Sequence, residues 1–219
     1  MAVEAIVLGV AQDAGVPQAG CICARCDHAR RDPAQRHLVA CLGLIDTATH
    51  QYWLIDATPD FRDQIHTLAQ QAYQHTTSLP NPPNSFSSLS PFTFAGILLT
   101  HAHIGHYTGL IHLGREAWNR RELPVYATAR MGAFLHENAP WSQLVDEHNI
   151  NLFPLVLEQE LALAPSLHVT PIPVRHRAEW SDTIAFLVRG PRRRLLYCPD
   201  VDGWSEGKVE SGEWGVGSG

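Results

Sequence analysis

Three histidines stand within six residues near the middle of the chain, in the run His101-Ala102-His103-Ile104-Gly105-His106. The apolar residues 96–100 precede them and predict a buried strand. Alternate residues at a strand end lie on the same side, so His101 and His103 can converge, and His106 comes at the start of the helix expected next. Neutral imidazoles at this spacing are typical ligands of zinc or another borderline divalent ion. The sequence therefore predicts a metal site rather than three solvated or core-capping histidines.

A second candidate metal site lies near the N-terminus. Three of the five cysteines follow a loop of small residues, glycine and proline, at Cys21, Cys23 and Cys26. The C-x-C-x-x-C spacing is typical of a tetrahedral structural zinc, which needs a fourth ligand, and the alternative is three ordinary buried cysteines. The fourth ligand is not evident, and His28 and His37 are the local candidates. Clustered cysteines favour a reducing compartment over disulfides, so a cytoplasmic protein is expected.

Three further residues with metal-binding side chains follow predicted strands, namely His176, Asp200 and Asp202. Taken alone, each would more often be structural. Because a metal bound by His101 and His103 needs further donors, these residues become candidates for the same site. Asp200 and Asp202 compete, since they lie two residues apart on the same side of an extended segment.

The elements that must position these residues alternate between strand and helix, which favours an α/β fold with parallel strands flanked by helices. Strands are expected at residues 5–10, 42–46, 52–55, 96–100, 124–128, 152–156, 160–163, 169–174, 184–189 and 195–197. Helices are expected at residues 61–73, 107–119, 129–137 and 141–148, with Asp60 as the N-cap of the first. Residues 75–92, rich in serine, proline and asparagine, are expected to form a surface loop.

The histidine run, following an apolar strand that ends at Thr100, resembles the His-x-His-x-Asp-His signature of the metallo-β-lactamase superfamily. Together with the small-residue loop and the cysteine cluster, residues 3–204 resemble the branch that holds coenzyme PQQ synthesis protein B and the PhnP-type phosphodiesterase. The resemblance implies a four-layer αβ/βα sandwich. It also implies structural zinc at the cysteines, and zinc, manganese or iron at the histidines.

The resemblance implies a role for each candidate residue. His101, His103 and His176 match the histidines that hold the first metal, and Asp200 matches the carboxylate that bridges two metals. His106 and Asp200 would hold a second metal or position the attacking water. Asp56 matches an aspartate that orients a metal-bound histidine from behind, although a simple turn carboxylate is an equal alternative. Asp202 is the competing candidate for the position of Asp200, and otherwise it would support a metal ligand from behind.

The chain departs from the superfamily pattern in two places. Gly105 stands where the superfamily has the aspartate that binds the second metal, so a mononuclear site is plausible. The resemblance also predicts a further segment ending in one more metal-binding histidine, and no histidine follows His176. Residues 1–204 are therefore expected to form one metallo-β-lactamase-like domain, shortened at its C-terminus, followed by a flexible Gly/Ser-rich tail at residues 205–219.

Composition limits the partners. The 219 residues are 45% hydrophobic and 17% charged, as in an ordinary folded domain. A formal net charge of −6 gives no general reason to bind nucleic acid or an anionic membrane, and no window resembles a membrane span. We expect a small-molecule substrate and, if the protein assembles, a homodimer.

Three functions are open at this point. The first is a metal-dependent hydrolase, in which a metal-bound hydroxide attacks an ester or phosphodiester. The second is an enzyme of pyrroloquinoline quinone biosynthesis with oxidative, iron-dependent chemistry, which the resemblance to the synthesis protein suggests. The third is an inactive metal-binding homologue, suggested by Gly105 and the missing C-terminal histidine.

Overall fold

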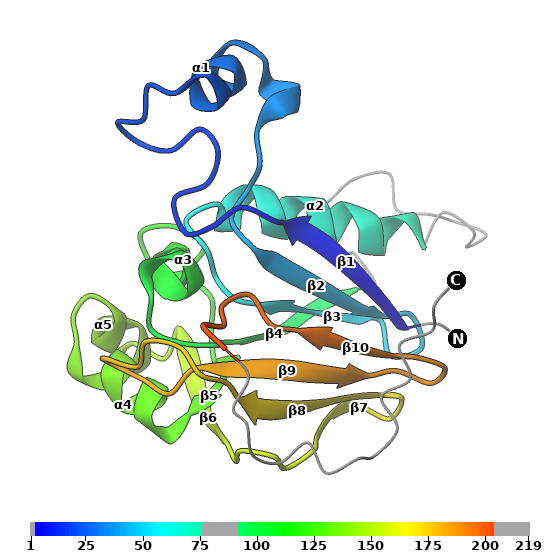
Figure 1. The fold of residues 1–219 in the computed structure, drawn as a ribbon. Helices are drawn as coiled ribbons and strands as arrows, with labels where there is room; N and C mark the ends of the chain where they lie inside the picture. Colours follow the sequence, from blue (N-terminus) through cyan, green and yellow to red (C-terminus); the bar gives the residue numbers. More distant parts are fainter. Residues whose placement is uncertain (1–2, 76–91, 204–219) are drawn as a thin grey trace.

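The computed structural model describes residues 3–75 and 92–203, which form two packed β-sheets (Figure 1). The six-stranded sheet has the order β1 (Val3–Gly9), β2 (Cys41–Asp46), β3 (Gln51–Ile55), β4 (Thr93–Leu98), β5 (Leu123–Thr128) and β6 (Ile150–Leu155). The first three strands pair antiparallel, and β3 to β6 pair parallel. The second sheet is antiparallel, in the order β10 (Arg194–Tyr197), β9 (Ile184–Arg189), β8 (Leu167–Pro173) and β7 (Leu161–Ala164).

Helices cover one face of the six-stranded sheet, and the four-stranded sheet covers the other. The helices are α1 (Ala24–Arg31), α2 (Phe61–Gln74), α3 (Ile104–Tyr107), α4 (Ala129–Glu137) and α5 (Trp141–Asp146), with short 3-10 helices at Pro33–Gln35 and Thr108–Leu113. Strand β3 shows why both faces are buried. Tyr52 and Leu54 pack toward the helices, whereas Trp53 and Ile55 pack toward the second sheet. A strand buried on both faces reads as a continuous apolar run.

The predicted α/β sandwich is therefore confirmed, with helices, parallel strands and a second sheet in the expected chain order. In the described part of the chain the layers are helix, sheet and sheet, and no helix there lies on the outer face of the four-stranded sheet. The segment that carries the cysteines and α1 stands away from this body at the top of Figure 1. The loop expected at residues 75–92 and the tail at 205–219 lie almost wholly outside the described residues.

The helix predicted at residues 107–119 is wrong in extent. The chain forms a single turn of helix α3 from Ile104, tightens into the 3-10 helix and turns at Asn119 with a positive φ. Close approach to the loop after β3 explains the tightening, because the Gly109 amide donates to the Ala57 carbonyl at 2.9 Å. A side chain at Gly109 would collide with the Thr58 carbonyl, so the backbone is held against that loop.

Asp60 is the N-cap residue of α2, as predicted, but the capping hydrogen bond expected of its side chain is not formed. Its Oδ2 instead accepts from the Val39 amide at 2.8 Å. Asp60 thus ties the start of α2 to the segment before β2.

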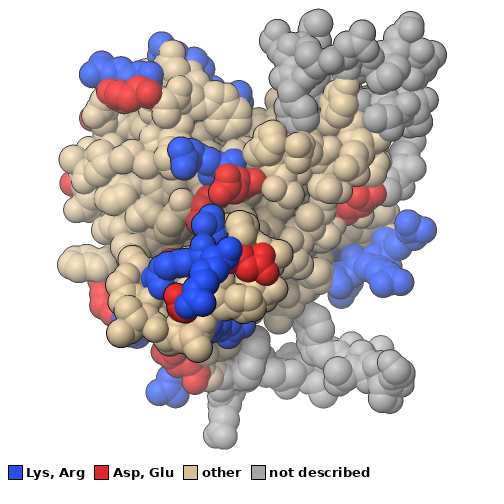
Figure 2. All heavy atoms as spheres, turned by 90° about the horizontal axis from the view of Figure 1, so that it is seen from above, with Lys and Arg blue, Asp and Glu red and all other residues tan. Residues whose placement is uncertain are grey.

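The described surface shows no broad field of one charge from the side that carries α1. Figure 2 shows basic side chains gathered nearest the viewer, with acidic ones beside them. Arg30 donates to the carbonyls of Cys21 at 2.6 Å and Gln18 at 2.8 Å, which holds the cysteine loop against α1. Among the described helices, none is both long and apolar enough to cross a membrane.

Candidate metal centre

The strands deliver the candidate ligands to one end of the sandwich. Asp56 directly follows β3, and the histidine loop and Asp200 begin within three residues of the ends of β4 and β10. Backbone bonds fix the two loops against each other, since the Asp56 amide donates to Leu98 and the Ala57 amide to His106, both at 2.8 Å. Ligand sites commonly form where the carboxyl ends of parallel strands meet.

Asp200 is the centre of the cluster. Its Oδ2 lies 3.2 Å from His101 Nε2, 3.4 Å from His106 Nε2 and 3.5 Å from His176 Nε2. His103 Nδ1 adds a fourth ring nitrogen, 2.9 Å from His101 Nε2. Asp200 therefore belongs to both groups of possible ligands, the one with His101 and His176 and the one with His106.

Hydrogen bonding from Asp56 sets the tautomer of His101. Asp56 is fully buried, and Thr100 Oγ1 lies 2.9 Å from its Oδ1 and 3.0 Å from His101 Nδ1. A carboxylate only accepts, so the hydroxyl proton goes to Asp56 and the hydroxyl oxygen accepts from His101 Nδ1–H. This assignment leaves the lone pair of His101 on Nε2, which faces Asp200.

Asp56 acts on His106 directly. His106 Nδ1 lies 2.8 Å from Asp56 Oδ2, and the Tyr197 hydroxyl donates to the same oxygen at 3.3 Å. His106 is buried, and its Nε2 has no hydrogen-bond partner of acceptable geometry among the described residues. That nitrogen faces Asp200 and a second carboxylate, Asp13 Oδ1, at 3.2 Å.

Two more carboxylates fix the remaining histidines. His103 Nε2 lies 3.1 Å from Glu179 Oε2, so its Nδ1 faces the cluster. His176 Nδ1 lies 2.9 Å from Asp202 Oδ1, so its Nε2 faces Asp200 and is likewise buried without a hydrogen bond. Every ring therefore has one nitrogen engaged at its back and the other presented to the centre, as metal-ligating histidines do.

The carboxylates of the cluster favour a positive charge among the histidines. Burial acts to lower the pKa of His106, but Asp56, Asp13 and Asp200 together raise it to about 12. The adjacent rings of His101 and His106 in turn hold the pKa of Asp200 far below its usual range. Burial lowers the pKa of His101, which keeps that ring neutral and able to coordinate.

The residues present fit a divalent cation. His101, His103, His176 and Asp200 place one donor atom each within 4.8 Å of one another, and Asp13, His106 and Asp200 do the same beside them. Two buried nitrogens, on His106 and His176, lack hydrogen bonds and point into these groups. Imidazole and carboxylate donors of this number suit zinc, manganese or iron.

The structure brings the predicted ligands together and places two further residues beside them. All five predicted ligands of the histidine site meet in one cluster, and Asp56 lies behind His106 as the resemblance implied. Asp202 contacts the back of His176 and is not part of either group, so it does not replace Asp200. Asp13 and Glu179 were missed. In the sequence, Gly105 could have pointed to Asp13, because the carboxylate missing at position 105 can be supplied by another loop.

The cysteine cluster also forms. The Sγ atoms of Cys21, Cys23 and Cys26 lie within 4.8 Å of one another, and the Cys26 Sγ accepts from the Gln18 amide at 3.4 Å. Hydrogen bonds, that from the Cys26 backbone first, lower the pKa of Cys23 to about 7, which favours the thiolate that metals bind. In the described chain neither His28 nor His37 joins the group, so the local fourth ligands proposed from sequence are not supported.

An aromatic hollow borders the histidine site. It has a volume of about 510 Å³ and shares Glu179 with the cluster, and its aromatic lining residues are Tyr107, Phe134 and Trp180. Trp180 is 64% exposed. Arg130 fixes its rim by donating to the carbonyls of Ala178 at 3.0 Å and Glu179 at 3.2 Å.

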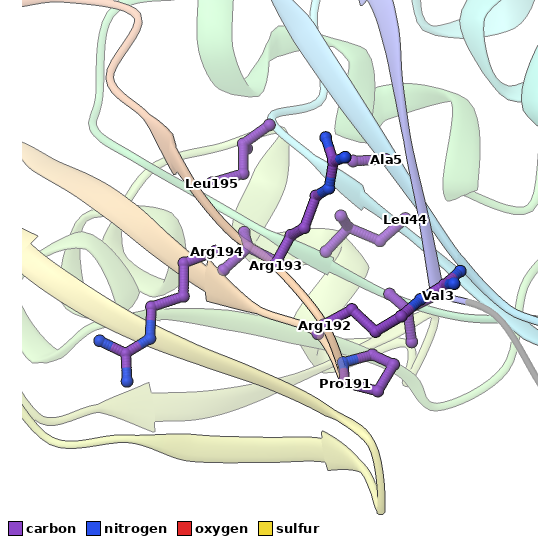
Figure 3. A pocket seen from close by; sticks show the side chains of 10 residues that line it. Val3, Ala5, Leu44, Pro191, Arg192, Arg193, Arg194 and Leu195 are labelled. Atoms are coloured by element: carbon purple, nitrogen blue, oxygen red, sulfur yellow. The ribbon is translucent and has the colours of Figure 1, made fainter. Parts of the chain in front are cut away.

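A second hollow lies away from the histidines, between β1 and β10 (Figure 3). It has a volume of about 570 Å³. Leu44 and Leu195 form part of its apolar lining, and Arg192 and Arg193 extend toward Val3 and Ala5. It contains none of the cluster residues and has no part in the metal site.

Comparisons with known proteins find one matching family and a set of similar proteins. Residues 52–213 match the family described as Beta-lactamase superfamily domain. Coenzyme PQQ synthesis protein B of Methylobacterium sp. (strain 4-46) is 27% identical over 210 residues, which are 90% of this chain and 64% of that protein. The chain thus spans less than two thirds of this curated relative's length.

Two solved structures share the fold. Zn(2+)-bound PqqB from Methylobacterium extorquens superposes with a TM-score of 0.68 and 22% identity, covering 92% of this chain and 67% of that one. A diphosphatase from the PhnP family superposes with a TM-score of 0.57 and 22% identity, covering 86% and 62%. The metallo-β-lactamase fold and the branch resemblance predicted from sequence are confirmed.

Proposed function

We propose that this chain, which belongs to the β-lactamase superfamily, is a metal-dependent hydrolase acting on an ester or phosphodiester. The observation that carries the proposal is Asp200 Oδ2, which lies within 3.5 Å of three histidine Nε2 atoms. Each of the surrounding rings is oriented by a partner on its other nitrogen. Such preorganisation is what hydrolytic metal sites need.

The chain's residues would divide the work as follows. His101, His103 and His176 would hold the ion with Asp200. When bound, a divalent ion supplies Lewis acidity and lowers the pKa of a coordinated water toward neutrality. Asp200 stays ionised because its pKa is lowered by His101 and His106, so it serves as an anionic ligand and hydrogen-bond acceptor. Asp202 is engaged with His176, which makes it a positioning residue rather than a proton donor.

The aromatic hollow would hold the substrate beside the metal. It touches the cluster through Glu179, and Trp180 and Phe134 offer ring surface at 6.4 Å centroid separation. Its charged lining residues are Arg130, Glu137 and Glu179. We therefore propose a small substrate with a flat or apolar group attached to the bond that is cleaved.

A role in pyrroloquinoline quinone synthesis is the second candidate. The similarity to coenzyme PQQ synthesis protein B across 90% of the chain favours it. Oxidation with iron at the histidine site would then replace hydrolysis. Iron in the purified protein, together with oxygen consumption in the presence of a peptide containing glutamate and tyrosine, would support this candidate over a hydrolase.

The inactive alternative has weaker support. A site that had lost its function would have no reason to keep every back-side partner, from Asp56 and Thr100 to Glu179 and Asp202. Gly105, which suggested inactivity, stands directly beside the carboxylate of Asp13.

The cysteine cluster is proposed as a structural zinc site. Its three thiols converge, and Arg30 holds the loop that presents them. Because this segment stands apart from the main body, a bound metal would supply the stabilisation that so short a segment cannot gain from a hydrophobic core of its own.

Turnover of a generic phosphodiester tests the hydrolase directly. Wild-type protein loaded with zinc, manganese or iron should hydrolyse bis(p-nitrophenyl) phosphate or a lactone, and His103→Ala should lose more than about a hundredfold in rate because a ligand is gone. His66→Ala, an exposed residue of α2, is the matched control and should keep wild-type turnover. Full metal occupancy without turnover of any of these substrates would count against the proposal.

A further inference from the structure

Asp13 fills the space that a side chain at position 105 would need. A Cβ built on Gly105 would lie 2.6 Å from the Asp13 carboxylate carbon and 2.8 Å from its Cα, which no real side chain tolerates. Any residue other than glycine at 105 would therefore displace Asp13. The carboxylate that a residue at 105 would carry is absent, and the carboxylate of Asp13 stands in its place.

The loop that carries Asp13 is built to hold it there. The Gly15 amide donates to the Gln12 carbonyl at 2.8 Å, which closes a turn around Asp13, and Gly15 adopts φ +65°. The amide of Ala11 donates to Leu38 at 2.9 Å, and that of Ala40 donates to Ala11 at 2.8 Å. Asp13 thus comes from a loop that is tied to the segment before β2.

An independent observation points to a cation at this position. His106 is 1% exposed, its Nδ1 is engaged by Asp56, and its buried Nε2 has no hydrogen bond within the described chain. That nitrogen faces Asp13 Oδ1 at 3.2 Å and Asp200 Oδ2 at 3.4 Å. A buried ring nitrogen and two carboxylates that converge in one partly buried place need a positive charge between them, and a metal ion bound by all three would supply it.

We propose that Asp13 is a ligand of a second metal ion, which it binds together with His106 and Asp200. Asp200 then bridges the two ions. The proposal rests on the metal site of the proposed function, because the two sites share Asp200. It makes the centre dinuclear despite Gly105, by supplying from the N-terminal loop the ligand that the histidine motif lacks.

Manganese binding followed by electron paramagnetic resonance tests this without reference to activity. Mn²⁺ prefers oxygen and imidazole ligands to thiolates, so it reports on the histidine centre rather than on the cysteines. Wild-type protein should bind two Mn²⁺ per chain and show an exchange-coupled spectrum, since bridged ions lie about 3.5–4 Å apart. Asp13→Ala and Asp13→Asn should each bind one and show the six lines of an isolated ion.

A substitution beside Asp13 separates ligand loss from loop damage. Gln12→Ala, in the same turn, should keep both Mn²⁺ ions and the coupled spectrum. Two coupled ions in both Asp13 variants would overturn the proposal. One Mn²⁺ in wild type would also overturn it, while leaving a mononuclear hydrolase intact. No Mn²⁺ at all would overturn the proposal together with the metal centre itself.

Discussion

Asp56 shows how much a single buried carboxylate organises. It adopts φ 69°, a left-handed conformation uncommon outside glycine, and it lies fully buried after β3. The amide of Thr100 donates to it at 2.9 Å, and the Thr100 hydroxyl, His106 Nδ1 and the Tyr197 hydroxyl complete its partners. Each partner is thereby held in one orientation, and two of them control which histidine nitrogen faces the centre.

Asp56→Asn should therefore weaken metal binding rather than abolish it. The side-chain amide of asparagine would place an N–H donor among groups that themselves donate to residue 56. His106 would also lose its anionic partner. Loss of such a partner behind a ligand lowers metal affinity by about 10- to 100-fold. Competition with a chelator of known affinity measures the change, and Asp63→Asn, an exposed residue of α2, is the control. Equal affinity in the two variants would show that Asp56 is only a turn residue.

Trp180 should affect substrate affinity more than metal content. Its ring is 64% exposed in the hollow that shares Glu179 with the cluster. Trp180→Ala should raise KM for a substrate with an aromatic group and leave the metal content unchanged. Comparing KM for aryl and methyl phosphodiesters checks this, and an equal change for both would argue against binding in the hollow.

At the scale of elements, apolar runs were the reliable signal. Strand β9 and helix α4 begin and end at the predicted residues. The other strands differ from the prediction by one to three residues at one or both ends. Periodicity failed after His106, because tertiary contact with the loop after β3 decided the helix type there. Local pattern could find the histidines and Asp200, whereas Asp13 and Glu179 reach the cluster only through the packing of distant loops.

Two glycines test the contact that shortens the predicted helix. Gly109→Ala places a Cβ 2.6 Å from Phe61 Cβ and into the Thr58 carbonyl, so it should destabilise the fold by about 1–3 kcal/mol. Gly132→Ala, in α4 with nothing within 4 Å, should instead stabilise it by about 0.5–1 kcal/mol. Denaturant unfolding gives both values, and equal stability of the two variants would refute the close contact.

The ion pair between Glu160 and Arg189 should make a pH-dependent contribution. Arg189 donates to both Glu160 oxygens, at 2.7 and 2.6 Å, joining β9 to the residue before β7. The side-chain bond with Arg189 lowers the pKa of Glu160, so its stabilisation is present above the usual carboxyl pKa and is lost as pH falls through the lowered value. Glu160→Gln should therefore cost stability at pH 7 and little at pH 2. A constant difference at both pH values would contradict this.

At the scale of the molecule, the site joins the two sheets. The Ala102 amide, in the histidine loop, donates to Ser181 Oγ at 2.8 Å, and the Ile184 amide donates to Thr100 at 3.2 Å. His176 and Asp200 follow strands of the second sheet, whereas His101 follows a strand of the first. A metal held by residues of both sheets would therefore stabilise the whole sandwich.

Metal removal should accordingly lower the melting temperature. At a free metal concentration of about a hundred times Kd, binding contributes about 2.7 kcal/mol, which corresponds to about 5–10 °C for a chain of this size. Calorimetry of Cys23→Ser, with and without chelator, isolates the histidine centre from the cysteine site. His103→Ala in the same background should lose most of the shift, and an undiminished shift there would mean that the ion is held elsewhere.

Anomalous diffraction from zinc-loaded crystals tests the central claim most directly, because it locates each ion and its donor atoms. We expect an anomalous zinc peak coordinated by His101 Nε2, His103 Nδ1, His176 Nε2 and Asp200, the atoms that face one another in the structure. Fully occupied zinc at the cysteines with no peak among the histidines would contradict it.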